Sequence, residues 1–151
     1  MDAGTEDIHP EAWLPNRAAL NAEYVLRRKS VSMSPKGVPA RQGICVTKAT
    51  HDQGVTSVTD LTDPAKAKLF DTDGNGKGEI WIGAPDWSST RIERIRAKSY
   101  GYDKTMDLLE ADEEVAVTAI DAAMAADEPP VFFCYEPHPT FRPPGSGVLA
   151  A

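Results

Sequence analysis

The sequence predicts an α/β protein built on a layered sheet. Short apolar, β-branched segments at residues 43–47, 79–82 and 130–135 have the composition of buried strands. Segments with helix start signals and an apolar edge alternate with these strands along the chain. Such alternation is typical of a sheet in which at least some strands run parallel.

The first forty residues are expected to hold an extension, a helix and a short strand. Residues 1–12 carry little pattern and are interpreted as an N-terminal extension. A helix with one apolar edge follows Asn16, a residue type that caps helix starts well. The alternating segment 31–33 predicts an edge strand. The segment SPKGVPARQ, residues 34–42, predicts a linker because proline and glycine recur in it.

Three more helices are predicted beyond this linker. Asp63-Pro64 is a clean start for a helix over 64–70, with Asp63 as N-cap and proline at the first helical position. A second helix opens at Ser88-Ser89-Thr90 and ends at Gly101, and a third spans 112–126. Inward-facing positions are expected at Ile92, Ile95 and Ser99 in the second helix, and at Val115, Ala119, Ile120 and Ala123 in the third. A strand is expected within 105–109, and residues 142–151 are interpreted as a linker or loose tail.

Length, composition and charge limit the kinds of partner. With 151 residues, 41% hydrophobic and 26% charged, the chain is large enough for one globular domain with a core. The net charge of -7 argues against nucleic acid or an anionic membrane, since both attract basic surfaces. The acidic N-terminus lacks the apolar core of a signal peptide, which predicts a cytoplasmic protein or a mature or excised piece of a secreted one.

Cys45 and Cys134 each lie in an apolar run, GICVT and VFFCY. Buried free thiols are the favoured interpretation of such positions, ahead of a disulfide. Two cysteines without a CxxC spacing do not make a metal site.

The loop DTDGNGKGE at residues 71–79 is the first candidate site. Oxygen ligands at alternate positions, with glycine at the sixth, match what Ca²⁺ needs. The candidate metal ligands are Asp71, Asp73, Asn75 and Glu79. The twelfth position of the loop is Ile82 rather than a glutamate, and a Gly/Asn/Asp turn that needs no metal explains the same residues. Both interpretations stay open, and no cofactor is required.

A second candidate site consists of three aromatic residues at chain reversals, Trp13, Trp87 and Tyr135. Aromatic faces that converge on a quaternary ammonium group form a cage for it. Aromatic residues at the rim of the core are the simpler alternative. The helix start at Ser88 and Ser89 offers free N–H groups and a positive dipole end for a carboxylate, although ordinary capping by serine accounts for these residues too.

Motifs of catalysis are absent from the sequence. There is no G-x-S-x-G, no glycine-rich nucleotide loop and no HExxH, and the cysteines and histidines show no supporting spacing. His9 and His138 each neighbour a proline and are interpreted as incidental. We therefore expect a binding protein and not an enzyme.

Four motifs carry a resemblance to a known family: DIHPEAWLPN, SVTDLxDPxxAKLFDTDGNGKGE, IGAPDW and PVFFCYEPH. Taken in order over residues 7–141, they resemble the periplasmic substrate-binding proteins of glycine betaine/proline betaine ABC transporters. The resemblance implies that residues 13–141 form one α/β lobe of a type II periplasmic substrate-binding protein. Full receptors of this type have two lobes and about twice this length, so the chain corresponds to a central portion.

The resemblance also implies roles for particular residues. Trp13, Trp87 and Tyr135 match the aromatic box around the trimethylammonium group. The amides of Ser88 and Ser89, together with Arg17, match the carboxylate-binding positions. Ala84 and Ser89 stand where some relatives carry a disulfide around the Trp87 loop.

The expected function is binding of glycine betaine or a related zwitterion in the periplasm, for delivery to a membrane ABC transporter permease. One alternative is a calcium-stabilised structural or interaction domain built on the 71–79 loop. Another is a solitary lobe that has lost ligand binding and self-associates as a homodimer. No nucleic-acid partner is expected.

Overall fold

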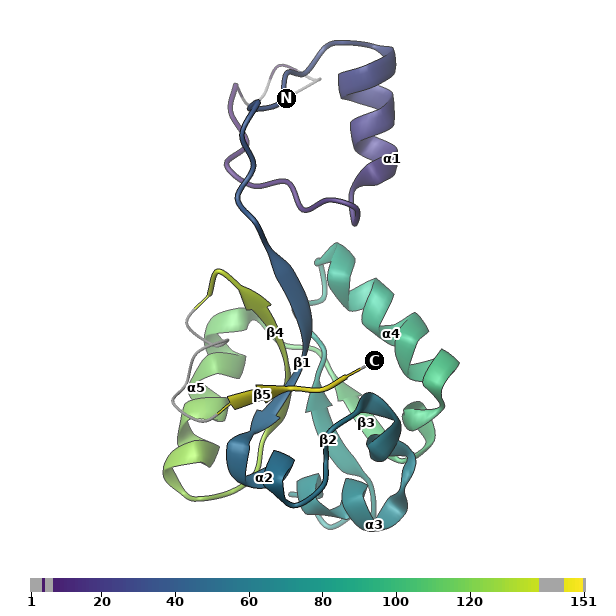
Figure 1. Ribbon diagram of the computed structural model, residues 1–151, viewed down its shortest axis with the longest axis vertical. Helices are drawn as coiled ribbons and strands as arrows, with labels where there is room; N and C mark the ends of the chain where they lie inside the picture. The colour runs from purple at the N-terminus through teal and green to yellow at the C-terminus, as the bar shows by residue number, and fades with distance from the viewer. Residues whose placement is uncertain (1–3, 5–6, 139–145, 151) are drawn as a thin grey trace. The chain divides into compact units, whose positions relative to one another are not determined.

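The computed structural model describes residues 4, 7–138 and 146–150 and divides the chain into two compact units. Unit 1 is Met1–Val38 and unit 2 is Pro39–Ala151 (Figure 1). The division falls within the 34–42 segment that the sequence predicts to be a linker. Among the described residues, none of the helices combines the length and apolar composition that crossing a membrane demands.

The described part of unit 1 contains one helical segment, in which α1 (Ala18–Leu20) continues as the π-helix η1 (Asn21–Arg27). The N-cap is Arg17, so the expectation of Asn16 as the cap is wrong. The amides of Arg17 and Ala18 already donate to the carbonyls of Trp13 and Pro15, at 3.0 and 2.8 Å. A backbone turn therefore satisfies these donors, and the helix begins without a side-chain cap.

The edge strand expected at 31–33 does not form. Unit 1 contains no other described strand with which the segment could pair, and a strand needs a hydrogen-bonded neighbour.

Unit 2 is built on a five-stranded sheet of order β3-β2-β4-β1-β5. The strands are β1 (Arg41–Thr47), β2 (Gly78–Trp81), β3 (Met106–Leu109), β4 (Val131–Glu136) and β5 (Ser146–Val148). β2 runs parallel to β3 and β4, whereas β1 runs antiparallel to β4 and β5. The prediction of an α/β sheet with parallel pairing is confirmed. β5 lies in the stretch that was expected to be a loose tail, and residues 142–145 of that stretch lie outside the described residues.

Helices and single turns connect the strands. They are α2 (Lys48–Asp52), η2 (Val58–Thr62), α3 (Pro64–Ala67), η3 (Lys68–Phe70), α4 (Ser88–Tyr100), η4 (Tyr102–Lys104) and α5 (Glu113–Ala125). α4 and α5 lie on either side of the sheet (Figure 1). Asp63 caps α3 through Ala65 N, and Gly101 ends α4 with a left-handed φ of 88°, as the sequence predicts.

The buried faces of α4 and α5 differ from those predicted. α4 buries its small and polar residues Ser89, Thr90, Glu93 and Ala97, while Ile95 is 58% exposed. Of the other two residues that were predicted to face inward, Ile92 is half-buried and Ser99 is exposed. In α5 the buried residues are Ala116 and Ile120, and Val115 and Ala119 face solvent. The prediction was correct for Ile120 and wrong for these two.

Cys45 and Cys134 form a disulfide with a Cα–Cα distance of 5.9 Å, so the expectation of free thiols is wrong. In the antiparallel pairing of β1 with β4, Cys45 lies opposite Phe132 and Cys134 lies opposite Gly43. The two cysteines are therefore diagonal neighbours on one face of the sheet. Both are fully buried. The pairing of strands so far apart in the chain, which brings the sulfurs together, has no local signal.

The core of unit 2 lies around the sheet. Its largest fully buried side chains are Tyr102, Phe70, Phe132, Phe133, Ile44, Leu61, Ile80, Ile82 and Met106.

Candidate ligand-binding site

Two of the predicted aromatic residues meet at one edge of the sheet in unit 2. Because β2 and β4 are parallel, their carboxyl ends lie at the same edge. Trp87 follows β2 at the start of α4, and Tyr135 lies near the end of β4. Their ring centroids are 5.9 Å apart, and the ring planes are at 83°. The carboxyl edge of such a sheet is where α/β folds commonly bind ligands.

The turn between β2 and α4 fixes the position of Trp87. Gly83 has a φ of 122°, which side-chain-bearing residues rarely adopt, and a Cβ there would lie 2.4 Å from Thr90 Oγ1. The Thr90 hydroxyl donates to the Ala84 carbonyl at 2.6 Å, and the Trp87 amide donates to the same carbonyl at 3.1 Å. The indole thus projects from a tightly bonded turn.

The Trp87 ring packs against two further aromatic side chains. Its ring contacts Trp81 and Phe133 edge-to-face, with centroid distances of 5.8 and 6.2 Å. Trp81 is buried, and its indole N–H donates to the Ala111 carbonyl at 3.0 Å. Trp87 itself is half-buried. No sequence pattern marked Trp81 or Phe133 as part of the site, because their contribution depends on which strands are neighbours.

The start of α4 lies directly beside Trp87. Trp87 is the N-cap residue, and no side-chain hydrogen bond caps the helix, so the alternative in which serine caps it is wrong. Ser88 is half-buried and Ser89 is buried, one after the other in the first turn. The first-turn amides of an α-helix have no partner within the helix and carry the positive end of its dipole. An anionic group next to Trp87 would meet these amides.

Tyr135 is held by two further side chains. Its hydroxyl donates to Glu113 Oε1 at 2.6 Å, and its ring lies 4.6 Å from the His138 ring with a tilt of 31°. His138 Nε2 is 3.4 Å from the same Glu113 oxygen. The interpretation of His138 as incidental is therefore wrong, because it packs against a candidate site residue. The position of His138 three residues after Tyr135 was a sequence signal that the two are neighbours. No sequence feature pointed to Glu113.

Trp13 and Arg17 belong to unit 1. The Trp13 indole is half-buried, and its N–H donates to the Glu11 carboxylate. Arg17, four residues further along the chain, is exposed. A role for these two residues in ligand binding stays a prediction.

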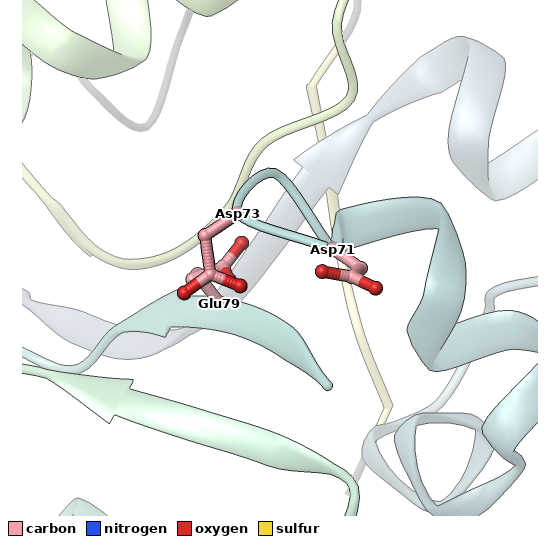
Figure 2. A group of neighbouring side chains, drawn as sticks. All are labelled: Asp71, Asp73 and Glu79. Atoms are coloured by element: carbon pink, nitrogen blue, oxygen red, sulfur yellow. The ribbon is translucent and has the colours of Figure 1, made fainter. Parts of the chain in front are cut away.

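Three of the four predicted metal ligands cluster at the acidic loop. Each of Asp71, Asp73 and Glu79 offers one carboxylate oxygen, and these oxygens lie within 4.8 Å of one another (Figure 2). Asn75 is used differently, because its side-chain amide donates to Asp73 and Asp107, and its oxygen accepts from the Lys77 amide.

Most of these carboxylate oxygens already accept hydrogen bonds from within the loop. Asp71 accepts from the amides of Gly74 and Gly76 at 2.8 and 3.0 Å. Glu79 Oε2 accepts from the amide and hydroxyl of Thr72, at 2.7 and 2.8 Å, while Oε1 is buried with no hydrogen-bond partner. The loop thus has an internal scaffold that holds its shape, and it keeps one oxygen that a cation could use.

Most of the chain matches one family of known proteins. Residues 1–143 match the family model described as the substrate binding domain of ABC-type glycine betaine transport systems. A glycine betaine/proline betaine-binding periplasmic protein of Salmonella typhimurium is 25% identical over 100 residues, which is 66% of this chain and 30% of that protein.

Two solved structures share the fold. A lactococcal protein, OpuAC, closed around glycine betaine, has a TM-score of 0.72 at 23% identity, over 99% of this chain and 53% of that one. A choline-binding protein of an ABC transporter, in complex with choline, has a TM-score of 0.69 at 20% identity, over 92% and 46%. The chain thus spans about half the length of the solved chains and less than a third of the Salmonella protein.

Proposed function

Because the chain belongs to the family of substrate-binding domains of ABC-type glycine betaine transport systems, we propose that it binds a quaternary ammonium zwitterion such as glycine betaine. The observation that carries this proposal is the meeting of Trp87 and Tyr135 beside the uncapped start of α4. One end of this arrangement suits a cation and the other suits an anion, as in the ligand itself.

The cationic end is proposed to rest on the two aromatic rings. A ring face attracts an ammonium group through its quadrupole, which contributes about 0.5–2 kcal/mol per contact. Trimethylammonium also gains from apolar contact, because its methyl groups are poorly hydrated. Trp13 is proposed as the third ring because its motif resembles that of the family.

The carboxylate end is proposed to bind the amides of Ser88 and Ser89. These N–H groups lie in the first turn of α4, where the helix dipole adds to the hydrogen bonds. Arg17 is proposed to contribute its charged, forked donor set to the carboxylate.

For the whole protein we propose uptake of this ligand through a membrane ABC transporter permease, with the binding domain located outside the cytoplasm. The buried Cys45–Cys134 disulfide supports that location, since disulfides persist mainly in oxidising compartments. Delivery of a ligand requires no bond-breaking chemistry, so we propose a non-enzymatic role. Formation of a homodimer stays a prediction, which sedimentation velocity would check.

Calorimetric titration of the 151-residue chain with glycine betaine, and separately with choline, tests the proposal. We expect saturable binding of glycine betaine with quenching or a shift of the tryptophan fluorescence. Trp87→Ala should abolish binding, whereas Tyr100→Ala, which removes a 38% exposed ring from the far end of α4, should leave it unchanged. No heat with either ligand up to about 10 mM, corresponding to less than about 3 kcal/mol of binding free energy, would reject the proposal.

A further inference from the structure

The Tyr135 hydroxyl donates a hydrogen bond to the Glu113 carboxylate, and this carboxylate has no role in the aromatic site as described so far. Glu113 Oε1 accepts the Tyr135 hydroxyl at 2.6 Å, and the same oxygen is 3.4 Å from His138 Nε2. The His138 ring covers Tyr135 at a centroid distance of 4.6 Å, and Trp87 approaches it at 5.9 Å. The phenol ring is therefore fixed by packing against two rings and by its hydroxyl group.

The fold places Glu113 at this point for a local reason. It is the first residue of α5, directly after the N-cap Asp112, where the positive end of the helix dipole stabilises a carboxylate. The helix is 13 residues long and therefore anchors the carboxylate on a rigid element. The Glu113 side chain is 30% exposed, so it is only partly screened by water.

We infer that Glu113 is a positioning and specificity-determining residue of the aromatic site, which makes Tyr135 selective for a cation over an uncharged group of the same shape. This inference rests on the proposed function, since it concerns the same ligand. Glu113 is an additional site residue, and its negative charge accounts for a preference for cations that the aromatic rings alone do not provide.

Two physical effects of Glu113 act in the same direction. A phenol that donates a short hydrogen bond to a carboxylate is polarised, and the added electron density strengthens the attraction of its ring for a positive charge. The carboxylate also attracts the ligand cation directly through a site with less screening than bulk water. An uncharged tert-butyl group gains from neither effect, although it fills the same volume.

The test compares two ligands of equal shape on the full chain. Glycine betaine carries trimethylammonium, and 3,3-dimethylbutanoate carries a tert-butyl group with the same carboxylate. In Glu113→Gln we expect the Kd for glycine betaine to rise about tenfold, because the ligand cation loses the attraction of a carboxylate in a partly screened site. We expect the Kd for 3,3-dimethylbutanoate, measured by competition or directly, to change by less than about threefold, since van der Waals contact is preserved.

A matched control is the adjacent residue. Glu114→Gln removes an equal charge from the same helical turn, but its side chain is exposed, and it should leave both Kd values unchanged. Tyr135→Phe removes only the hydroxyl. In the Tyr135→Phe background, Glu113→Gln should raise the Kd for glycine betaine less than it does in the wild type, because part of the effect of Glu113 passes through its hydrogen bond to Tyr135. The inference would be overturned if Glu113→Gln weakened the binding of both ligands equally, or if it weakened the binding of neither.

A measurement without ligand separates this inference from the proposed function. The tyrosine doublet in ultraviolet resonance Raman spectra reports phenol hydrogen bonding, and the difference between wild type and Tyr135→Phe isolates this residue. A strong donor signal that is lost in Glu113→Leu, whose side chain has no acceptor, supports the hydrogen bond to Glu113, and absence of the signal in the wild type overturns the inference. A wild type that shows the signal and binds neither zwitterion nor choline would instead reject the proposed function and, with it, the selectivity assigned to Glu113.

Discussion

The rings of Trp87 and Tyr135 stand nearly perpendicular, at 83°, with their centroids 5.9 Å apart, although 48 positions separate them in the chain (135 − 87). The contact arises because each residue follows or ends one of two parallel strands, β2 and β4. Two loops that leave the same edge of a sheet can present side chains to a common ligand.

Gly83 is predicted to be essential for the position of Trp87. Gly83→Ala forces a side chain into a φ of 122° and against Thr90 Oγ1, so we expect a loss of about 1–3 kcal/mol in stability together with loss of ligand binding. Urea unfolding followed by tryptophan fluorescence measures the first effect. Gly37→Ala is the control, since a Cβ there meets nothing within 4 Å. A Gly83→Ala variant as stable as wild type would contradict this account of the turn.

The Cys45–Cys134 disulfide is predicted to stabilise unit 2 substantially. It closes a loop with a sequence separation of 89, and replacing both cysteines by alanine should cost about 3–5 kcal/mol in the free energy of unfolding. Guanidinium titration of the two proteins gives this difference. Alkylation of the denatured, unreduced wild type should label no thiol, and labelling of both cysteines would show that the bond does not form.

Calcium is proposed as a ligand of the Asp71–Glu79 loop. We expect the melting temperature to rise with CaCl₂ and to return on adding EDTA, because a ligand at about a hundred times its Kd adds about 2.7 kcal/mol of stability. Asp71→Asn with Asp73→Asn should abolish the rise. Asp121→Asn, an exposed acid on α5, should preserve it. A melting temperature indifferent to calcium would favour the metal-free turn.

The buried carboxyl of Glu93 is predicted to make stability depend on pH. Burial raises the pKa of Glu93 above its usual 4.5, and the Arg96 guanidinium, with Nη1 3.2 Å from Oε1, opposes this only in part. The folded state therefore binds the proton more tightly than the unfolded state does. The contribution of Glu93 to stability falls as the pH rises from 4.5 through the higher pKa of the folded state.

Glu93→Gln should consequently stabilise the protein at neutral pH and lose that advantage near pH 4. We expect a gain of about 2–4 °C in melting temperature at pH 7, equivalent to about 1 kcal/mol for a domain of this size. Scanning calorimetry at a series of pH values would follow the gain, with Glu114→Gln as an exposed control. A variant less stable than wild type at every pH would show that the Arg96 contact outweighs the cost of burial.

The elements that the sequence predicted correctly have local causes. The Asp63-Pro64 start of α3 and the Gly101 end of α4 depend on residues within a few positions of each other. Strands β1, β2 and β4 follow from short apolar runs. The candidate pair Trp87 and Tyr135 could be proposed because each stands at a chain reversal and the motifs around it resemble one family.

The features that sequence analysis missed depend on contacts between distant segments. The disulfide requires that β1 and β4 pair in one particular register. The buried face of α4 consists of small and polar residues, which a search for apolar periodicity does not find. Glu113 becomes part of the site only because α5 begins where β4 ends, and no motif marks that meeting.

β5 lies against β1, so the strand by which the chain enters unit 2 and the last described strand are neighbours. The Leu149 amide donates to the Ile44 carbonyl at 2.8 Å just beyond their ladder. An unpaired strand at the edge of a sheet is a template for pairing with another chain. By pairing with β1, β5 covers backbone groups at that edge that would otherwise be open to such pairing.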